Sequence, residues 1–126
     1  MSNYFELYKI ILTEISNHSP ENAFQLFENL SFNDYIIQEK VNNPALAQDV
    51  LCILDNMIAD GLVNGKVTPT KDGKLYTLSG LSSLGHQYLS EIDTPRFSDK
   101  LKKFVKENGI SLTPQGITKL IAQLIF

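Results

Sequence analysis

Three side chains in this sequence have the chemistry of a nucleophile or of its base, namely Cys52, His18 and His86. A cysteine beside a histidine can act as a catalytic nucleophile, because the imidazole accepts the thiol proton. Cys52, however, lies in the middle of a predicted helix beside its buried face, away from the helix N-terminus that would lower a thiol pKa. We therefore expect no catalytic dyad and no enzyme activity.

Metal and phosphate chemistry also lack their usual sequence patterns. A single cysteine excludes an internal disulfide and a cysteine-rich zinc site, and the two histidines and scattered carboxylates show no metal-ligand spacing. The seven glycines fit neither the dinucleotide-binding pattern G-x-G-x-x-G nor a phosphate-binding loop. The sequence therefore predicts no cofactor, and a function in binding rather than catalysis.

The composition is that of one globular domain. The chain has 126 residues, of which 43% are hydrophobic and 20% charged. No basic segment followed by an apolar run begins it, and no stretch approaches ~18 uninterrupted apolar residues, so we expect neither a signal peptide nor a membrane partner. A single cysteine is typical of a reducing compartment, and we expect a cytoplasmic protein.

Charge is divided unequally between the two halves of the chain. Residues 1–60 hold two lysines and nine acidic residues, a net charge of −7, whereas residues 61–126 hold nine basic and five acidic residues, a net charge of +4. Such runs are commonly solvated faces. They are also typical of a basic surface that binds nucleic acid or an acidic protein.

The elements that must position these charges begin with helices. Ser19 as N-cap with Pro20 after it predicts one helix start, Asn43 before a proline predicts another, and Gly61 predicts a left-handed stop. Residues 31–43 are compatible with an extended segment or a short helix. Apolar spacing predicts helices over residues ~3–17, ~20–30 and ~44–60.

A β-hairpin is predicted after Gly61, because the apolar period changes and turn dipeptides appear. Its strands are expected at residues ~62–69 and ~74–79, with Lys71, Asp72 and Gly73 at the tip. Further helices are expected after Ser82, after Thr94-Pro95 and after Thr113-Pro114.

Gly85 and His86 lie in the first turn of the helix that Ser82 begins. We expect the missing side chain of Gly85 to let this turn press against the hairpin or a neighbouring helix. The positive end of the helix dipole disfavours a protonated imidazole, so we expect His86 to be structural and not a phosphate contact.

The fold class predicted from this order is mostly α with a small β-hairpin: a winged helix-turn-helix domain over residues 1–93, followed by two C-terminal helices. Residues 94–126 are expected to pack on that domain as one structural unit. Over roughly residues 53–126 the chain also resembles the YjcQ-like family of small prophage-associated winged-helix proteins, found in Gram-positive bacteria and their phages. The family pattern L-T-x-x-G-H-x-F-L is matched, with Ser for Thr and Tyr for Phe, by Leu81, Ser82, Gly85, His86, Tyr88 and Leu89.

Major-groove recognition by the helix over residues 44–60 is disfavoured, because its outward face lacks Lys and Arg and carries Asp49 and Asp55. Basic residues lie instead on the hairpin and on the helix over residues 96–106, although a solvated amphipathic helix shows the same stripe. The candidate nucleic-acid contacts are Lys66, Lys71, Lys74, Arg96, Lys100 and Lys103.

The last helix is apolar over more than the ~100° that docking on one core requires. Its surface is either a homodimer or partner interface, or the face by which a terminal helix packs into its own domain. The candidate interface residues are Ile117, Leu120, Ile121 and Leu124.

Two functions remain open at this point. The leading hypothesis is a small nucleic-acid-binding regulator of phage or prophage type that uses the wing and the helix over residues 96–106, and dimerises through residues 113–126. The alternative is a protein-interaction module without DNA binding, for example a defence-system inhibitor. It would target a host or phage protein, with the acidic front half as contact surface or DNA mimic.

Overall fold

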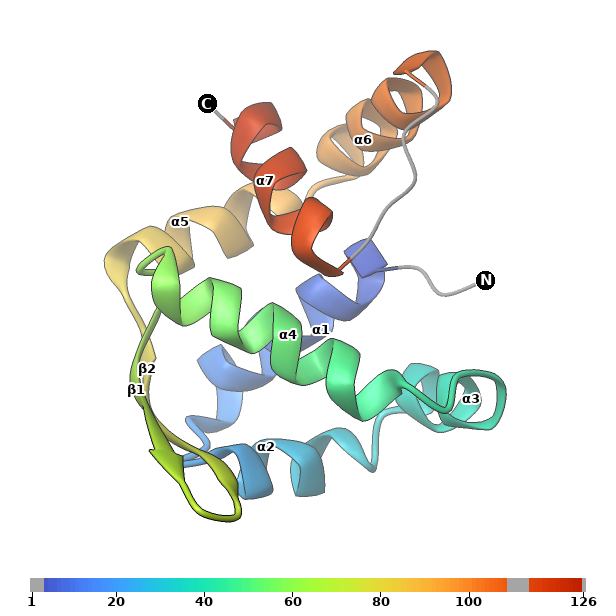
Figure 1. Ribbon diagram of the computed structural model, residues 1–126. Helices are drawn as coiled ribbons and strands as arrows, with labels where there is room; N and C mark the ends of the chain where they lie inside the picture. The colour runs from blue at the N-terminus through green and yellow to red at the C-terminus, as the bar shows by residue number, and fades with distance from the viewer. Residues whose placement is uncertain (1–3, 109–113, 126) are drawn as a thin grey trace.

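The computed structural model describes residues 4–108 and 114–125, apart from the side chains of Asn108, Pro114, Gln115, Ile117 and Thr118. In this part of the chain, helices predominate and two antiparallel strands form one hairpin (Figure 1). The elements are α1 (Tyr4–His18), α2 (Ala23–Leu30), α3 (Asp34–Asn42), α4 (Leu46–Ala59), β1 (Val63–Thr70), β2 (Gly73–Leu81), α5 (Ser83–Ile92), α6 (Pro95–Asn108) and α7 (Pro114–Ile125). The prediction of a mostly helical chain with a small hairpin is confirmed.

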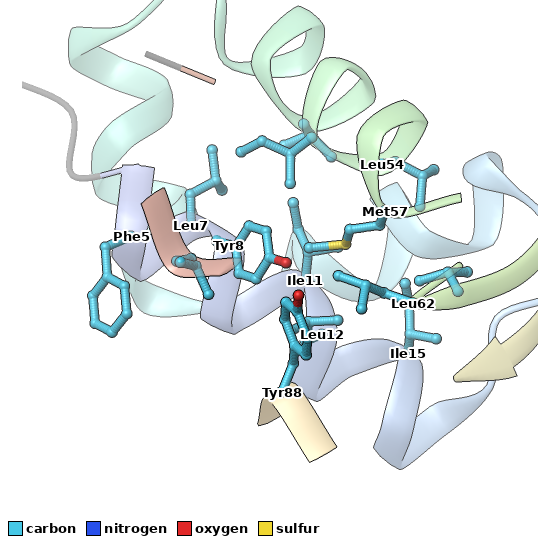
Figure 2. Packing of buried hydrophobic residues seen from close by; sticks show 14 of the residues in the cluster. Phe5, Leu7, Tyr8, Ile11, Leu12, Ile15, Leu54, Met57, Leu62 and Tyr88 are labelled. Atoms are coloured by element: carbon cyan, nitrogen blue, oxygen red, sulfur yellow. The ribbon is translucent and has the colours of Figure 1, made fainter. Parts of the chain in front are cut away.

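Helix α1 is the centre of the core. It contacts α2, α4, α5, α7 and β2, and its inward side chains are fully buried. Figure 2 shows these side chains beside Met57 of α4, Leu62 and Tyr88 of α5. A helix that is apolar at three- and four-residue spacing forms this kind of central support.

Helix α2 begins later than the sequence indicated. The predicted N-cap, Ser19, lies in a left-handed turn with φ of 44°. The true N-cap is Asn22, whose side chain accepts a hydrogen bond from the backbone three residues later (2.8 Å). Asn22 also bridges to Thr77, and the Leu78 amide donates to the Glu21 carbonyl (2.8 Å). This pairing with β2 keeps the backbone extended, so the prediction of a helix from Pro20 was wrong.

The ambiguous stretch over residues 31–43 contains a helix, α3. The Asn33 side chain caps it by accepting a hydrogen bond from the Ile36 amide (3.1 Å). Ile36 is the one buried side chain of this helix, so α3 is held to the rest of the fold by little apolar contact.

Helix α4 has the buried face that the sequence predicted, except that Ile58 is only partly buried. It begins slightly later than expected, because the Asn43 side chain accepts a hydrogen bond from the Ala45 amide (3.0 Å) and forms a turn. Gly61, with φ of 76°, ends the helix as predicted. The buried residues are Leu46, Val50, Ile53, Leu54 and Met57.

The hairpin also follows the prediction, with Lys71 and Asp72 as its turn. Tyr76 and Leu78 face the core, and their neighbours along β2 are exposed. The Asn64-Gly65 dipeptide, whose residue types are common in turns, lies inside β1, where the register shifts at a bulge.

The three last helices connect the wing-like hairpin back to the core. The Ser82 hydroxyl caps α5 by accepting from the Gly85 amide (3.0 Å), and Thr94 caps α6 in the same way through Phe97 (3.2 Å). Helix α7 packs against α4 and α1, and α6 contacts α5 and α7, so both helices contact the rest of the described chain. In the described residues, no helix combines the length and apolar character needed to cross a membrane.

Candidate interaction surfaces

The six basic residues predicted to contact nucleic acid are all exposed, but they lie in two separate places. Lys66, Lys71 and Lys74 are on the hairpin, whereas the other three are on α6. Figure 1 shows the hairpin tip and α6 at opposite corners of the molecule. The structure therefore does not bring the six cations together into one surface.

Two of these cations are engaged within the protein. The Lys74 ammonium lies 3.6 Å from the Asp55 carboxylate, and the Lys100 ammonium donates a hydrogen bond to the Leu124 carbonyl (2.9 Å). Lys100 belongs to α6, and its ammonium group reaches the C-terminal end of α7, where the negative end of the helix dipole favours a cation. In the described part of the chain, Lys66 and Lys71 are the hairpin cations without an ion pair.

The outward face of α4 lies partly against the hairpin. The Asp55 carboxylate accepts a hydrogen bond from the Tyr76 hydroxyl and pairs with Lys74. Cys52 lies one turn earlier on α4, and the charges of both Asp55 and Lys74 act on its thiol. The part of α4 that would approach DNA therefore holds acidic groups and a hairpin contact.

The Tyr76 side chain makes stability depend on alkaline pH. Burial, followed by the hydrogen bond to Asp55 and the Asp55 charge, raises its pKa from 10.0 to about 12. The unfolded chain loses this proton near pH 10 while the folded chain keeps it, so the free energy of unfolding falls between about pH 10 and about pH 12. The free energy of unfolding of Tyr76→Phe should therefore fall by roughly 1–2 kcal/mol less than that of the wild type over this range. Urea unfolding of both proteins at about pH 9 and about pH 11.5 measures this, and equal losses would contradict it.

The surroundings of Cys52 raise the pKa of its thiol, whereas a reactive cysteine has a lowered pKa. Burial and the negative charges of Asp55 and Asp49 raise its pKa, while Lys74 lowers it. The imidazole of His18 pairs instead with Glu14 (2.7 Å). Across residues 4–108 and 114–125, no group of three or more histidine, cysteine or acidic side chains is placed to hold a metal ion.

His86 is exposed on the first turn of α5. Its backbone amide donates to the Ser82 carbonyl (3.0 Å), a bond that any residue makes. We expect His86→Gln to change the free energy of unfolding by less than about 0.5 kcal/mol. Urea unfolding checks this, and a loss above about 1 kcal/mol would show that the imidazole is structural after all.

The apolar residues predicted for a dimer or partner interface belong largely to the protein's own core. Leu120 and Ile121 are buried, Leu124 is partly exposed, and the side chain of Ile117 lies outside the described part of the structure. Because α7 packs on α4 and α1, Leu120 and Ile121 do not form a free surface.

An exposed apolar surface lies elsewhere, on α2 and α3. Five large apolar side chains are exposed among the described residues, and four of them fall between residues 24 and 41. Val41 is 82% exposed and Ile37, one turn before it, is 50% exposed. The others are Phe24 and Phe32. Sequence reasoning missed this surface because residues 31–43 had no assigned helix; the spacing of Ile37 and Val41 was its one signal.

A pocket of about 450 Å³ opens between α2, α3 and α4. Its lining is mainly apolar, and Lys40 and Asn43 are the polar side chains that border it along with Ser31. The apolar lining includes Phe27, Leu30, Ile36, Pro44, Leu46 and Val50. Concave apolar pockets of this size are typical binding sites.

Comparisons with protein-family models, with curated proteins and with solved structures find no match to this chain. The candidate binding surfaces are therefore identified from the exposed residues of the chain itself. These form the basic hairpin tip, the basic α6, and an acidic and apolar surface on α2 and α3.

Proposed function

We propose that this chain is a winged-helix binding protein that acts through contact with another protein, at the surface formed by α2 and α3. Helix α3 is an additional helix between α2 and α4, and the order α1, α2, α4, hairpin and α5 supports the winged-helix part of the proposal. So does the pairing of Asn22 with Thr77, because a short strand between the first two helices of such a domain joins the hairpin.

The observation that carries the protein-contact part is the exposure of Ile37 and Val41, which lie one turn apart on the same face of α3. Large aliphatic side chains on the solvent side of a helix add nothing to its own core, and clusters of them mark interaction surfaces. The partner in this proposal is a host or phage protein.

Substitution of the exposed aliphatic pair tests this function. We expect Ile37→Gln/Val41→Gln to leave the free energy of unfolding within about 0.5 kcal/mol, since both side chains are exposed. We also expect at least a tenfold loss of the protein captured from a bacterial host lysate, because burying two aliphatic side chains contributes about 3 kcal/mol. Quantitative mass spectrometry of the captured fraction measures the loss.

The matched control is Lys66→Gln/Lys71→Gln, which changes an exposed pair on the hairpin. This control should capture the same protein as the wild type. Capture that depends on the hairpin pair and not on the aliphatic pair would overturn the proposal.

Nucleic-acid binding is the second candidate function, favoured by the exposure of Lys66 in β1 and of Lys71 in the hairpin turn. If it holds, affinity for random duplex DNA falls with salt with a log–log slope of about −2, as expected for two phosphate contacts. Reversing the two hairpin charges would abolish that binding, while Lys103→Glu on α6 would leave it. No detectable binding at low salt ends this candidate.

A further inference from the structure

We infer that another pocket, between the end of α1 and α2, binds an uncharged sugar. This pocket has a volume of about 660 Å³ and shares no residue with the apolar pocket described above. It contains neither Ile37 nor Val41, so the sugar site does not depend on the proposed protein contact. Its lining is polar apart from one phenyl ring, and consists of Glu14, His18, Gln25, Asn29, Phe32 and Asn33.

Two helices contribute pairs of polar side chains to this pocket. Glu14 and His18 lie one turn apart on α1, and the same spacing relates Gln25 and Asn29 on α2. The two other lining residues follow α2 at its junction with α3. A rise of about 1.5 Å per residue separates the members of each pair by about 6 Å along the helix axis. The pocket can therefore bond to several groups of one ligand.

Hydrogen bonds fix the orientation of two of the amide side chains. Oε1 of Gln25 accepts from the Glu21 amide (2.9 Å). Oδ1 of Asn33 accepts from the Ile36 amide (3.1 Å). Because a backbone N–H can only donate, each contact identifies the side-chain oxygen and leaves the NH₂ group as the other end. Neither NH₂ group donates a hydrogen bond within the described chain, so the pocket offers two oriented donors.

An acceptor is supplied by α1. Oε1 of Glu14 is buried and lies 2.7 Å from Nδ1 of His18. The second carboxylate oxygen makes no hydrogen bond among the described residues, and neither does the Asn29 side chain. A ligand group that both donates and accepts suits a pocket with these donors and this acceptor, and a hydroxyl is such a group.

Phe32 supplies an apolar face. It lines the pocket although 81% of its surface is exposed, so most of the phenyl ring is open to a ligand. A sugar ring carries C–H groups on its faces and hydroxyls around its edge. Packing the C–H groups on the phenyl ring removes apolar area from water and leaves the hydroxyls to bond with the amides and the carboxylate.

The charge around the pocket disfavours an anionic ligand. Residues 10–39 contain five acidic residues and no lysine or arginine, and the whole lining falls in this segment. A phosphate or a carboxylate would therefore meet a negative potential. A cation would be attracted to Glu14, but the two oriented NH₂ groups cannot accept a hydrogen bond from it. An uncharged ligand with hydroxyls can use both kinds of group.

Titration of sugars into the ¹⁵N-labelled full chain tests this site, because the side-chain NH₂ groups of Gln25, Asn29 and Asn33 give their own NMR signals. The probes are neutral mono- and disaccharides that differ in hydroxyl configuration, the uronic acid of each monosaccharide, adenosine and argininamide. We expect at least one neutral sugar to shift these signals with a Kd in the millimolar range. It should bind at least tenfold tighter than its uronic acid, adenosine or argininamide. A disaccharide that binds tighter than its component sugars would identify a sugar chain as the ligand, and equal binding would identify a free sugar.

Two exposed phenylalanines provide a matched pair of variants. Phe32→Ala should weaken the best neutral sugar at least tenfold, because it removes the face on which the ring packs. Phe24→Ala changes a side chain that is 76% exposed and outside the pocket lining, and should leave the affinity unchanged. Both variants should unfold in urea as the wild type does, since both side chains are exposed. Asn29→Ala should also weaken the sugar, without loss of a hydrogen bond within the described chain.

Three results would overturn the inference. They are the absence of binding by any neutral sugar at about 100 mM, tighter binding of the uronic acid, adenosine or argininamide, and equal losses in Phe32→Ala and Phe24→Ala. Ile37→Gln/Val41→Gln should bind the sugar as the wild type does, because neither residue lines this pocket. Failure of the proposed protein contact would therefore leave the sugar titration unchanged, and failure of the sugar titration would leave the protein contact standing.

Discussion

Gly85→Ala is expected to lower the free energy of unfolding by about 2–3 kcal/mol, although alanine is the better helix former. The first turn of α5 lies directly against the chain segment that enters the hairpin. A Cβ atom at Gly85 would collide with the backbone carbonyl oxygen of Leu62. Close approach of two backbones is a position that only glycine fills without strain.

The Leu62 carbonyl cannot easily move away. It accepts a hydrogen bond from the Ser82 amide (2.9 Å) and another from the Ser82 hydroxyl (3.1 Å), and the Leu62 side chain is fully buried. A new methyl group therefore strains backbone atoms on both sides of the contact, not the flexible end of a side chain.

Urea unfolding followed by circular dichroism measures this effect. The matched control is Ser83→Ala, at an exposed position of the same turn, which should remain within about 0.5 kcal/mol of the wild type. Wild-type stability of Gly85→Ala would mean that α5 does not approach Leu62 as closely as described.

Ile121→Ala should lower the free energy of unfolding by about 2–4 kcal/mol, as a large-to-small substitution in the central core does. The Ile121 side chain is fully buried, and α7 packs on α4 and α1. Removing three carbon atoms there leaves a cavity lined by helices that are fixed by their other contacts. The whole chain should still unfold in one transition, because α7 and α4 share one core.

Thermal and urea unfolding at two protein concentrations distinguish this packing from a dimer interface. The expected loss is independent of protein concentration, and the control Gln123→Ala, at an exposed position of α7, should be neutral. A melting temperature that rises with concentration in the wild type and not in Ile121→Ala would place Ile121 in an interface between copies.

Local signals in the sequence were good guides to where elements begin and end. Ser82 and Thr94 cap the helices that they were predicted to cap, and Gly61 adopts the left-handed conformation expected of a helix stop. Gly85 lies at a close backbone contact, as its position in the first helical turn implied. Each of these depends on hydrogen bonds and sterics within a few residues, or on the absence of one side chain.

The candidate site was much less accessible to sequence reasoning. The predicted basic surface combined the hairpin with α6, which the fold places far apart, and Lys74 and Lys100 are engaged within the chain. The surface on α3 was missed because its helix is short and buries little, so its apolar period is weak.

By itself, the sequence determined the helical character of the chain, the hairpin and its turn, and the helix ends at Gly61, Ser82 and Thr94, because these follow from short-range periodicity and backbone geometry. Tertiary structure alone decided that Asn22 pairs with Thr77 and delays α2, and that Leu120 and Ile121 enter the core. It also decided that Val41 stays in solvent. Contacts between residues distant along the chain depend on how whole elements pack, and the apolar spacing of one helix does not reveal which neighbour covers it.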